Sequence, residues 1–370
     1  MLNSSRRDFC KAAFCKTATG ALGLAAFTGA RAQQAQTPAW ELPPRNTKPI
    51  SIDVHTHWFP EVFVNAMAKI GRPPTTTTYP LRADMERRIR WMDTHGVQTM
   101  VLSLSGDTPW QWVSKKQGIQ IAQVVNDAAV ESHAMFPERL LGAIEIFVKD
   151  PDACVREIDR VASKPGMKAI ALPNSLEGQY DYVFEPNFAP VLARCEALGL
   201  PLMFHPLNGE VNYYGGPHTR LGGTLSDSVR YWNTLGFTFD SATTAAKFVT
   251  TGTLDKYPKL DVVLPHAGGS FPYIAGRVEH GLTRKTFPAQ HPMRDYIRRF
   301  YYDTITYDLE ALRFLVELVG SDRVVIGTDN QFFAATQNFE YPNAIVEHLN
   351  LPDADEDRIL RGNAKVLLHL

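Results

Sequence analysis

The chain has few cysteines. Four occur among its 370 residues, and two of them, Cys10 and Cys15, fall near the N-terminus. The other two, Cys154 and Cys195, lie in separate segments of helical pattern. Isolated cysteines of this kind are usually buried apolar side chains, even in an oxidising compartment. The sequence therefore predicts no disulfide bond.

An excess of charge of either sign is also absent. The chain carries 38 basic and 39 acidic residues, which gives a net charge of −1 at pH 7. Without a basic excess it lacks the electrostatic signature of proteins that bind nucleic acid or a membrane surface. We therefore expect no nucleic-acid partner, and a small molecule becomes the expected ligand.

The N-terminal apolar stretch, residues 18–28, is too short and too rich in small residues to remain in a bilayer as a helix. It follows Ser5-Arg6-Arg7-Asp8-Phe9-Cys10-Lys11, which resembles the twin-arginine export motif, and precedes Ala30-Arg31-Ala32, which resembles a signal-peptidase site. We expect residues 1–32 to be a signal peptide recognised by the twin-arginine translocation machinery. The mature protein would then be periplasmic. A basic, frayed N-terminus is the alternative.

After an expected linker over residues 33–48, the chain alternates apolar runs with amphipathic segments. Eight runs have the character of parallel strands buried on both faces. They cover residues 50–55, 99–104, 140–147, 168–173, 200–205, 260–266, 300–306 and 323–329. Eight strand–helix repeats predict a (β/α)8 barrel of the TIM type as one catalytic domain over residues 49–370. An open doubly wound sheet is the alternative, but no Gly-x-Gly-x-x-Gly turn follows a strand.

Two connections are too long to be simple loops. Residues 58–81, after the first strand, are expected to form a small inserted cap. Residues 206–239, after the fifth strand, are expected to fold over the barrel mouth as a lid or a subunit contact.

Histidines and one aspartate fall at the carboxyl ends of the expected strands, where barrel enzymes carry their chemistry. His55 and His57 are two residues apart, so in a strand they project from one face. His205, His266 and Asp329 end the fifth, sixth and eighth strands. Imidazole and carboxylate groups around one opening are typical ligands of zinc and related divalent metals. The pattern therefore predicts a metal site.

Five stretches form a specific combination. They are Asp53-Val54-His55-Thr56-His57, Phe204-His205-Pro206, His266-Ala267-Gly268-Gly269-Ser270-Phe271-Pro272-Tyr273-Ile274-Ala275-Gly276-Arg277, Gly327-Thr328-Asp329 and Gly362-Asn363-Ala364. Together they resemble the metal-dependent amidohydrolase superfamily, in the branch similar to 2-amino-3-carboxymuconate 6-semialdehyde decarboxylase and γ-resorcylate decarboxylase. The resemblance extends over residues 49–370.

The resemblance implies that His55, His57, His205 and Asp329 hold one divalent metal, most simply zinc, with manganese as the alternative. His266, together with Asp329, would act as the acid/base beside the open metal position. Binuclear members of the superfamily carry a lysine at the end of the fourth strand. Here the only lysine of that strand, Lys168, lies at its opening end, which favours a single metal.

The resemblance also implies a homodimer, because the arginine matching Arg277 crosses into the neighbouring subunit and binds a substrate carboxylate. An ordinary surface arginine is the alternative. Trp58 and Asn330 are the other expected substrate contacts. The branch often has Tyr-Pro-Phe after the last strand, whereas this chain has Asn330-Gln331-Phe332. Tyr79-Pro80-Leu81 stands where the muconate enzyme has a substrate-binding arginine, and both departures disfavour that substrate.

Three further residues have expected roles. Asp53 would support the site from one layer below. Asp303, in the seventh strand, would either reach the mouth or pack inside the barrel. Asn363 would cap the last helix.

Three functions are compatible with these residues. The resemblance implies a non-oxidative decarboxylase, a C–C lyase acting on an aromatic or unsaturated small carboxylic acid. In this function the metal polarises the substrate, and a histidine and an aspartate handle the proton. The same groups would serve a metal-dependent hydrolase or hydratase of a lactone, an amide or a related substrate. A periplasmic binding barrel without turnover is the third interpretation.

Overall fold

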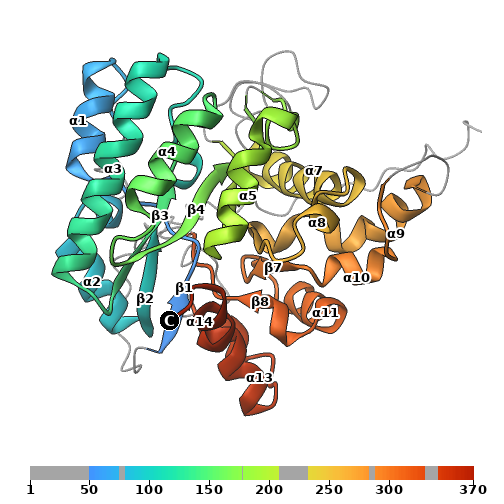
Figure 1. Cartoon of the computed structure of the whole chain (residues 1–370). Helices are drawn as coiled ribbons and strands as arrows, with labels where there is room; N and C mark the ends of the chain where they lie inside the picture. Colours follow the sequence, from blue (N-terminus) through green and yellow to red (C-terminus); the bar gives the residue numbers. More distant parts are fainter. Residues whose placement is uncertain (1–49, 75–79, 177, 208–231, 283–287, 330–340) are drawn as a thin grey trace, which may run out of the picture. The chain divides into compact units, whose positions relative to one another are not determined.

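The computed structural model describes residues 50–74, 80–176, 178–207, 232–282, 288–329 and 341–370 (Figure 1). The expected signal peptide and linker lie outside these ranges, as does most of the expected lid, residues 208–231. Export, periplasmic location and lid function therefore stay predictions. Within the described ranges no helix has the length and apolarity needed to span a membrane.

Eight parallel strands form one sheet whose order follows the chain. They are β1 (Ser51–Asp53), β2 (Val97–Leu102), β3 (Leu140–Glu145), β4 (Met167–Pro173), β5 (Leu202–His205), β6 (Val262–Leu264), β7 (Phe300–Asp303) and β8 (Val324–Val325). Just past the ends of β1 and β8, the Val54 N–H donates to the Ile326 carbonyl at 3.0 Å and the Asp329 N–H donates to the His55 carbonyl at 2.9 Å. These bonds close the sheet, so the predicted (β/α)8 barrel is confirmed and the open sheet is excluded.

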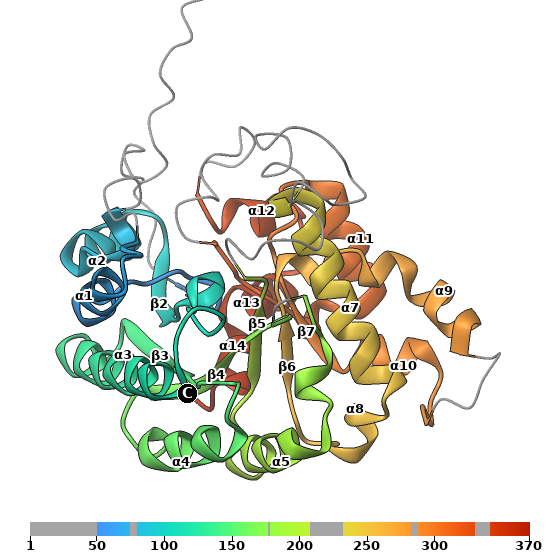
Figure 2. The ribbon, with the colours of Figure 1, turned by 90° about the horizontal axis from the view of Figure 1, so that it is seen from above.

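Helices surround the barrel on its outer face (Figure 2). They are α1 (Glu61–Lys69), α2 (Met85–Thr94), α3 (Lys115–Met135), α4 (Pro151–Val161), α5 (Ala189–Leu198), α7 (Phe237–Thr250), α8 (Thr253–Lys256), α9 (Phe271–Leu282), α10 (Met293–Ile297), α11 (Leu309–Val319), α12 (Ala344–Glu347), α13 (Asp353–Asp357) and α14 (Asn363–Leu367). Several begin at a side-chain cap, as at Asp84, Ser114, Asp150 and Asp308, which satisfies a first-turn N–H group.

The strand side chains divide into two apolar layers. One cluster fills the barrel interior and includes Ile52, Val101, Leu141, Ala143 and Met203. Alternate residues of the same strands, such as Met100 and Ile144, belong to the larger cluster that packs under the helices. The strands are therefore buried on both faces, as their continuous apolar runs predict.

The predicted cap after β1 contains α1 and the short 3₁₀ turn η2 (Pro80–Arg82). Trp58 and Phe59 are buried in the larger apolar cluster, and the Phe59 ring lies 5.7 Å from that of Phe63. Tyr79 lies outside the described residues. The side chains of Trp58 and Phe59 therefore pack against other apolar side chains of this cluster. Both later cysteines, Cys154 and Cys195, are buried and free, as predicted.

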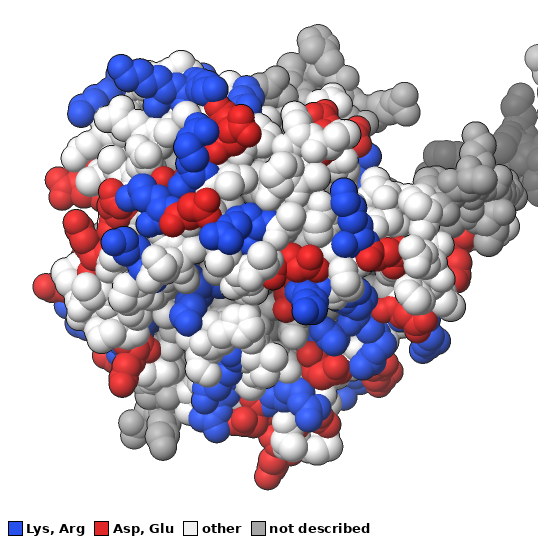
Figure 3. Space-filling model, viewed as in Figure 1, with Lys and Arg blue, Asp and Glu red and all other residues white. Residues whose placement is uncertain are grey.

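The surface carries mixed charge. On the face shown in Figure 3, basic and acidic side chains are interspersed over the described part of the molecule. This distribution matches the near-zero net charge of the sequence.

Two sequence predictions differ from the structure. Several strands end earlier than expected. The sixth, expected to run to His266, ends at Leu264, shortly before the left-handed backbone of His266 (φ +53°) turns the chain. Asn363 is the first residue of α14 and not its cap. Its amide donates instead to the carbonyls of Ser321 and Val324, both at 2.7 Å, and so fixes the start of β8.

We expect Asn363→Ala to lower the free energy of unfolding by about 1–3 kcal/mol, because the carbonyl groups of Ser321 and Val324 lose their hydrogen-bond donor. Chemical denaturation of the purified variant measures this. The control is Asn65→Ala, which changes an exposed residue of α1 and should have an effect within about 0.5 kcal/mol. Equal stability of the two variants would contradict the anchoring role.

Candidate metal centre

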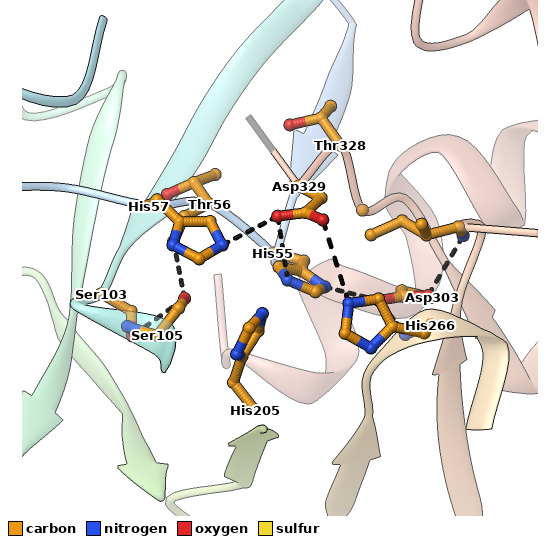
Figure 4. Close-up of polar contacts among 12 residues, drawn as sticks. His55, Thr56, His57, Ser103, Ser105, His205, His266, Asp303, Thr328 and Asp329 are labelled. Carbon is orange, nitrogen blue, oxygen red and sulfur yellow. Dashed lines mark hydrogen bonds and ion pairs between the residues drawn. The ribbon is translucent and has the colours of Figure 1, made fainter. Parts of the chain in front are cut away.

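Four side chains converge at the carboxyl ends of β1, β5 and β8 (Figure 4). His55, His57, His205 and Asp329 are all buried, and each offers one ligand atom within 4.8 Å of the others. The ring centroids of His55 and His57 each lie 4.9 Å from that of His205. The structure thus brings together the four residues that the family resemblance implied as metal ligands.

Asp329 divides its two oxygens between two neighbours. Its Oδ1 lies 2.8 Å from Nε2 of His57 and 3.7 Å from Nε2 of His55. Its Oδ2 faces Nε2 of His266 at 3.9 Å. One oxygen is therefore aimed into the histidine cluster and the other toward the predicted acid/base.

Each clustered histidine uses Nδ1 for a partner outside the cluster. Nδ1 of His205 donates to the Pro206 carbonyl at 2.6 Å, and because a carbonyl can only accept, Nε2 of His205 carries the lone pair. Nδ1 of His55 lies 2.6 Å from Asp303 Oδ2, and Nδ1 of His57 lies 3.2 Å from Asp107 Oδ2. This arrangement presents three Nε2 atoms inward, as in metal-binding histidines.

The donor set fits a divalent cation. Within the described ranges, Nε2 of His55 and Nε2 of His205 are buried and have no hydrogen-bond partner. A buried polar atom left without a partner costs about 1–3 kcal/mol. Three imidazoles and one carboxylate are a ligand set that zinc and other divalent transition metals accept. A cation at the centre would satisfy these atoms together.

Burial and neighbouring charge shift several pKa values. Burial, and then the neighbouring His55 and His57, hold the pKa of His205 well below its ordinary value. Burial, and then His55, lower the pKa of His266 to about 4. Burial opposes ionisation of Asp329, but the bond to His57 and the nearby histidines hold its pKa below the usual range. His205 is thus held in the neutral form that binds metals. Burial also opposes protonation of His55, but its hydrogen bond to Asp303 and the nearby carboxylates raise its pKa above the ordinary value.

Two aspartates support the cluster. Asp303 accepts the His266 N–H at 2.9 Å and the Ala267 N–H at 2.7 Å, besides contacting His55. Asp303 therefore reaches the mouth of the barrel, which is one of the two roles that the sequence allowed for it. Asp53 accepts from the Thr328 hydroxyl at 2.6 Å and thereby fixes the residue next to Asp329.

Backbone strain is concentrated at this mouth. Ser105, His266, Ala267, Tyr307 and Asp329 have positive φ without being glycine, and all follow strands at the carboxyl end of the barrel. Such conformations cost of order 1–3 kcal/mol each and are typical of functional sites.

Two neighbours of the cluster carried no sequence signal. Phe237, in α7, packs its ring against His266 with centroids 5.5 Å apart and an interplanar angle of 23°. Asp107, in the turn η3 (Ser105–Asp107), contacts His57 and also accepts from Arg82 at 3.3 Å. Phe237 lies at the start of a helix and Asp107 in a turn. The alternation of side chains along a strand therefore does not identify either of them as facing the site.

Of the predicted substrate contacts, the structure describes Trp58 and Arg277, and neither is among the clustered side chains. Trp58 is buried in the apolar core, and its backbone N–H donates a hydrogen bond to the Ser103 carbonyl. Arg277 is exposed on α9. Asn330 lies outside the described residues. Their roles stay predictions.

Comparisons with known proteins agree with this arrangement. A family model described as amidohydrolase matches residues 52–370. The chain is 27% identical over 299 residues to a γ-resorcylate decarboxylase of Rhizobium radiobacter, covering 77% of this chain and 87% of that protein. It is 24% identical over 348 residues to a 2-amino-3-carboxymuconate-6-semialdehyde decarboxylase of Dictyostelium discoideum, covering 87% and 92%.

A solved structure shares the fold. The dihydroxybenzoic acid decarboxylase of a Polaromonas species, with bound manganese and the inhibitor 2-nitroresorcinol, superposes with a TM-score of 0.68 and is 24% identical. The match covers 87% of this chain and 97% of that one.

We expect Asp303→Asn to weaken binding of a divalent metal by about 10–100-fold, because the His55 ring loses the charged partner that orients it. Competition with a chromophoric chelator, measured on the folded variant, gives the dissociation constant. Asp322→Asn is the matched control, since Asp322 pairs with Arg298 on the outside of the barrel. An unchanged constant in Asp303→Asn would show that the contact is not needed.

Proposed function

Because the chain belongs to the amidohydrolase family, we propose that it is a metal-dependent, non-oxidative decarboxylase of an aromatic or unsaturated small carboxylic acid. One observation carries this proposal: Asp329 joins a single His₃–Asp cluster through one oxygen and faces His266 through the other. The decarboxylase activity of the curated relatives supports the same assignment.

In the proposed enzyme His55, His57, His205 and Asp329 hold one divalent ion. When bound, that ion supplies a Lewis acid that polarises a substrate oxygen. Zinc suits the ligand set, and manganese is the alternative because a related structure contains it. A single ion is favoured because β4 offers no lysine at the mouth of the barrel to bridge two metal ions. Its lysine, Lys168, lies at the opening end of the strand, where Nζ donates to the His369 carbonyl at 3.1 Å.

The chain's own residues handle the proton. Loss of CO2 leaves an electron pair on carbon, and that carbon must then receive a proton. His266 is placed to deliver it, because its backbone N–H is held by Asp303 and its ring packs against Phe237. The proton would come from water: His266 would take it up transiently, with the Asp329 carboxylate 3.9 Å away stabilising the imidazolium, and would pass it to that carbon. General acid–base groups fixed in this way contribute about 10²–10⁴-fold to rate.

A metal-dependent hydrolase or hydratase is the second candidate, since the same groups can activate water. It differs in product, because hydrolysis of a lactone or amide releases an acid and no CO2. The binding-protein interpretation predicts ligand affinity without any product.

We expect metal-loaded protein to release CO2 from at least one member of a panel of hydroxybenzoates and unsaturated acids. In D2O the product should carry deuterium at the carbon that lost the carboxylate. His266→Ala should lower kcat by about 10²–10⁴-fold. The control is His348→Ala, which changes an exposed histidine just after α12 and should leave kcat unchanged. Acid release from lactones or amides without CO2 would favour the hydrolase.

We also propose a homodimer in which Arg277 completes the partner's site. One exposed face of α9 presents Tyr273, Gly276, Arg277 and His280, which are spaced for a single helix side. Tyr273 is 84% exposed, a large aromatic surface that a subunit contact would cover. The guanidinium would bind a substrate carboxylate by paired hydrogen bonds.

Mixed dimers test this arrangement. His57→Ala and Arg277→Ala proteins should each be inactive alone, whereas remixed chains should regain about a quarter of wild-type activity, because half of the dimers then contain one complete site. No recovery on mixing, or a monomer in sedimentation, would refute the trans arrangement.

A further inference from the structure

Glu145 is a buried carboxyl group that the proposed mechanism does not use. It is the last residue of β3, and its side chain is 1% exposed. Leu141 and Ala143, on the same face of the strand, belong to the cluster inside the barrel, so Glu145 points inward at the mouth. Burial raises the pKa of Glu145 to about 7. A carboxyl group in such a place is costly unless it is hydrogen-bonded.

The hydrogen bonds of the Glu145 side chain go to one loop. Glu145 Oε1 accepts the backbone N–H of Leu104 at 2.7 Å and the hydroxyl of Ser103 at 3.3 Å. The Ser103 hydroxyl oxygen in turn accepts the backbone N–H of Ser105 at 2.8 Å. Glu145 therefore holds the loop that follows β2, residues 103–107, from the β3 side.

The same loop is held from the β1 side. The Ser105 hydroxyl donates to the Thr56 carbonyl at 2.9 Å, and the Trp58 N–H donates to the Ser103 carbonyl at 2.9 Å. Thr56 stands between His55 and His57, so this contact reaches the cluster directly (Figure 4). Ser105 has a positive φ of 48°, a strained conformation that needs such restraints to persist.

The loop contacts two of the proposed metal ligands. Asp107 Oδ2 lies 3.2 Å from Nδ1 of His57. Gly106 lies against His205 so closely that a Cβ there would be 2.8 Å from Nδ1 of His205 and 2.5 Å from the Pro206 carbonyl oxygen. A shift of this loop would therefore move the partner of one ligand and the wall behind another.

We propose that Glu145 is a positioning residue that fixes the loop 103–107, so that Asp107 and Gly106 hold His57 and His205 in the geometry of the metal site. This inference rests on the proposed function, because it assumes that the cluster binds a metal. It predicts that the role needs a hydrogen-bond acceptor at Oε1 and no negative charge.

The chain offers a matched control in Glu157. Asn126 joins the two glutamates, since its amide donates to the Glu145 carbonyl at 2.9 Å and to Glu157 Oε1 at 2.7 Å. Both glutamates are buried in one polar network. Only Glu145 contacts the loop, because Glu157 lies in α4 and pairs with Arg160.

The experiment uses cobalt(II) as the probe, since its visible absorption reports ligand geometry and needs no substrate. Wild type, Glu145→Leu, Glu145→Gln and Glu157→Leu are compared for cobalt affinity, cobalt spectrum and thermal stability. Glu145→Leu should bind cobalt about 10–100-fold more weakly and with an altered spectrum. Glu145→Gln, which keeps an acceptor for Leu104, should resemble wild type in both. Glu157→Leu should lose stability but keep the affinity and the spectrum.

Wild-type affinity and spectrum in folded Glu145→Leu would overturn the inference, as would an equal loss in Glu157→Leu. If Glu145→Leu does not fold, Ser103→Ala takes its place, because it removes the hydroxyl that links Glu145 to Ser105. That variant should weaken cobalt binding by up to about tenfold, and an unchanged affinity would overturn the inference. A wild type that binds no cobalt would contradict the proposed function itself, which separates the two failures.

Discussion

The convergence of four ligand-type side chains on one buried point is the constraint on which the rest of the site depends. The ligand atoms of His55, His57, His205 and Asp329 lie within 4.8 Å of one another. Among the described residues, Nε2 of His55 and Nε2 of His205 are buried without a hydrogen-bond partner, which costs about 1–3 kcal/mol for each atom. A cation at the centre removes that cost. Without a bound cation, the protein must therefore hold the four side chains in an arrangement that is unfavourable by itself.

The surrounding residues keep the ligand side chains in this arrangement by contacting each histidine from outside the cluster. Asp303, Asp107 and the Pro206 carbonyl each contact one histidine at Nδ1 and so set which nitrogen faces inward. The loops that carry these partners include residues with positive φ. Their strained backbone conformations persist because the rigid strands and the many hydrogen bonds around them stabilise the loops. The strain at the mouth is thus part of how the site is preorganised.

Much of this could be predicted from the sequence, because parallel strands bring their carboxyl ends to one edge. That rule alone places His205 and Asp329 together although they are far apart in the chain. Residues outside the strands follow no such rule. Phe237 lies at the start of a helix and Asp107 in a short turn, and neither is marked by spacing in the sequence. The helices α7 and α8 are separate because Gly252 between them adopts φ +70°, which a periodic apolar pattern does not reveal.

The most direct test of the account is the metal content of protein purified without chelator, measured by mass spectrometry for wild type and His57→Ala. The account predicts about one equivalent of zinc or manganese per wild-type chain and its loss in the variant. Two equivalents would contradict the single site. A folded wild type with no metal, and with none taken up on addition, would contradict the metal centre altogether.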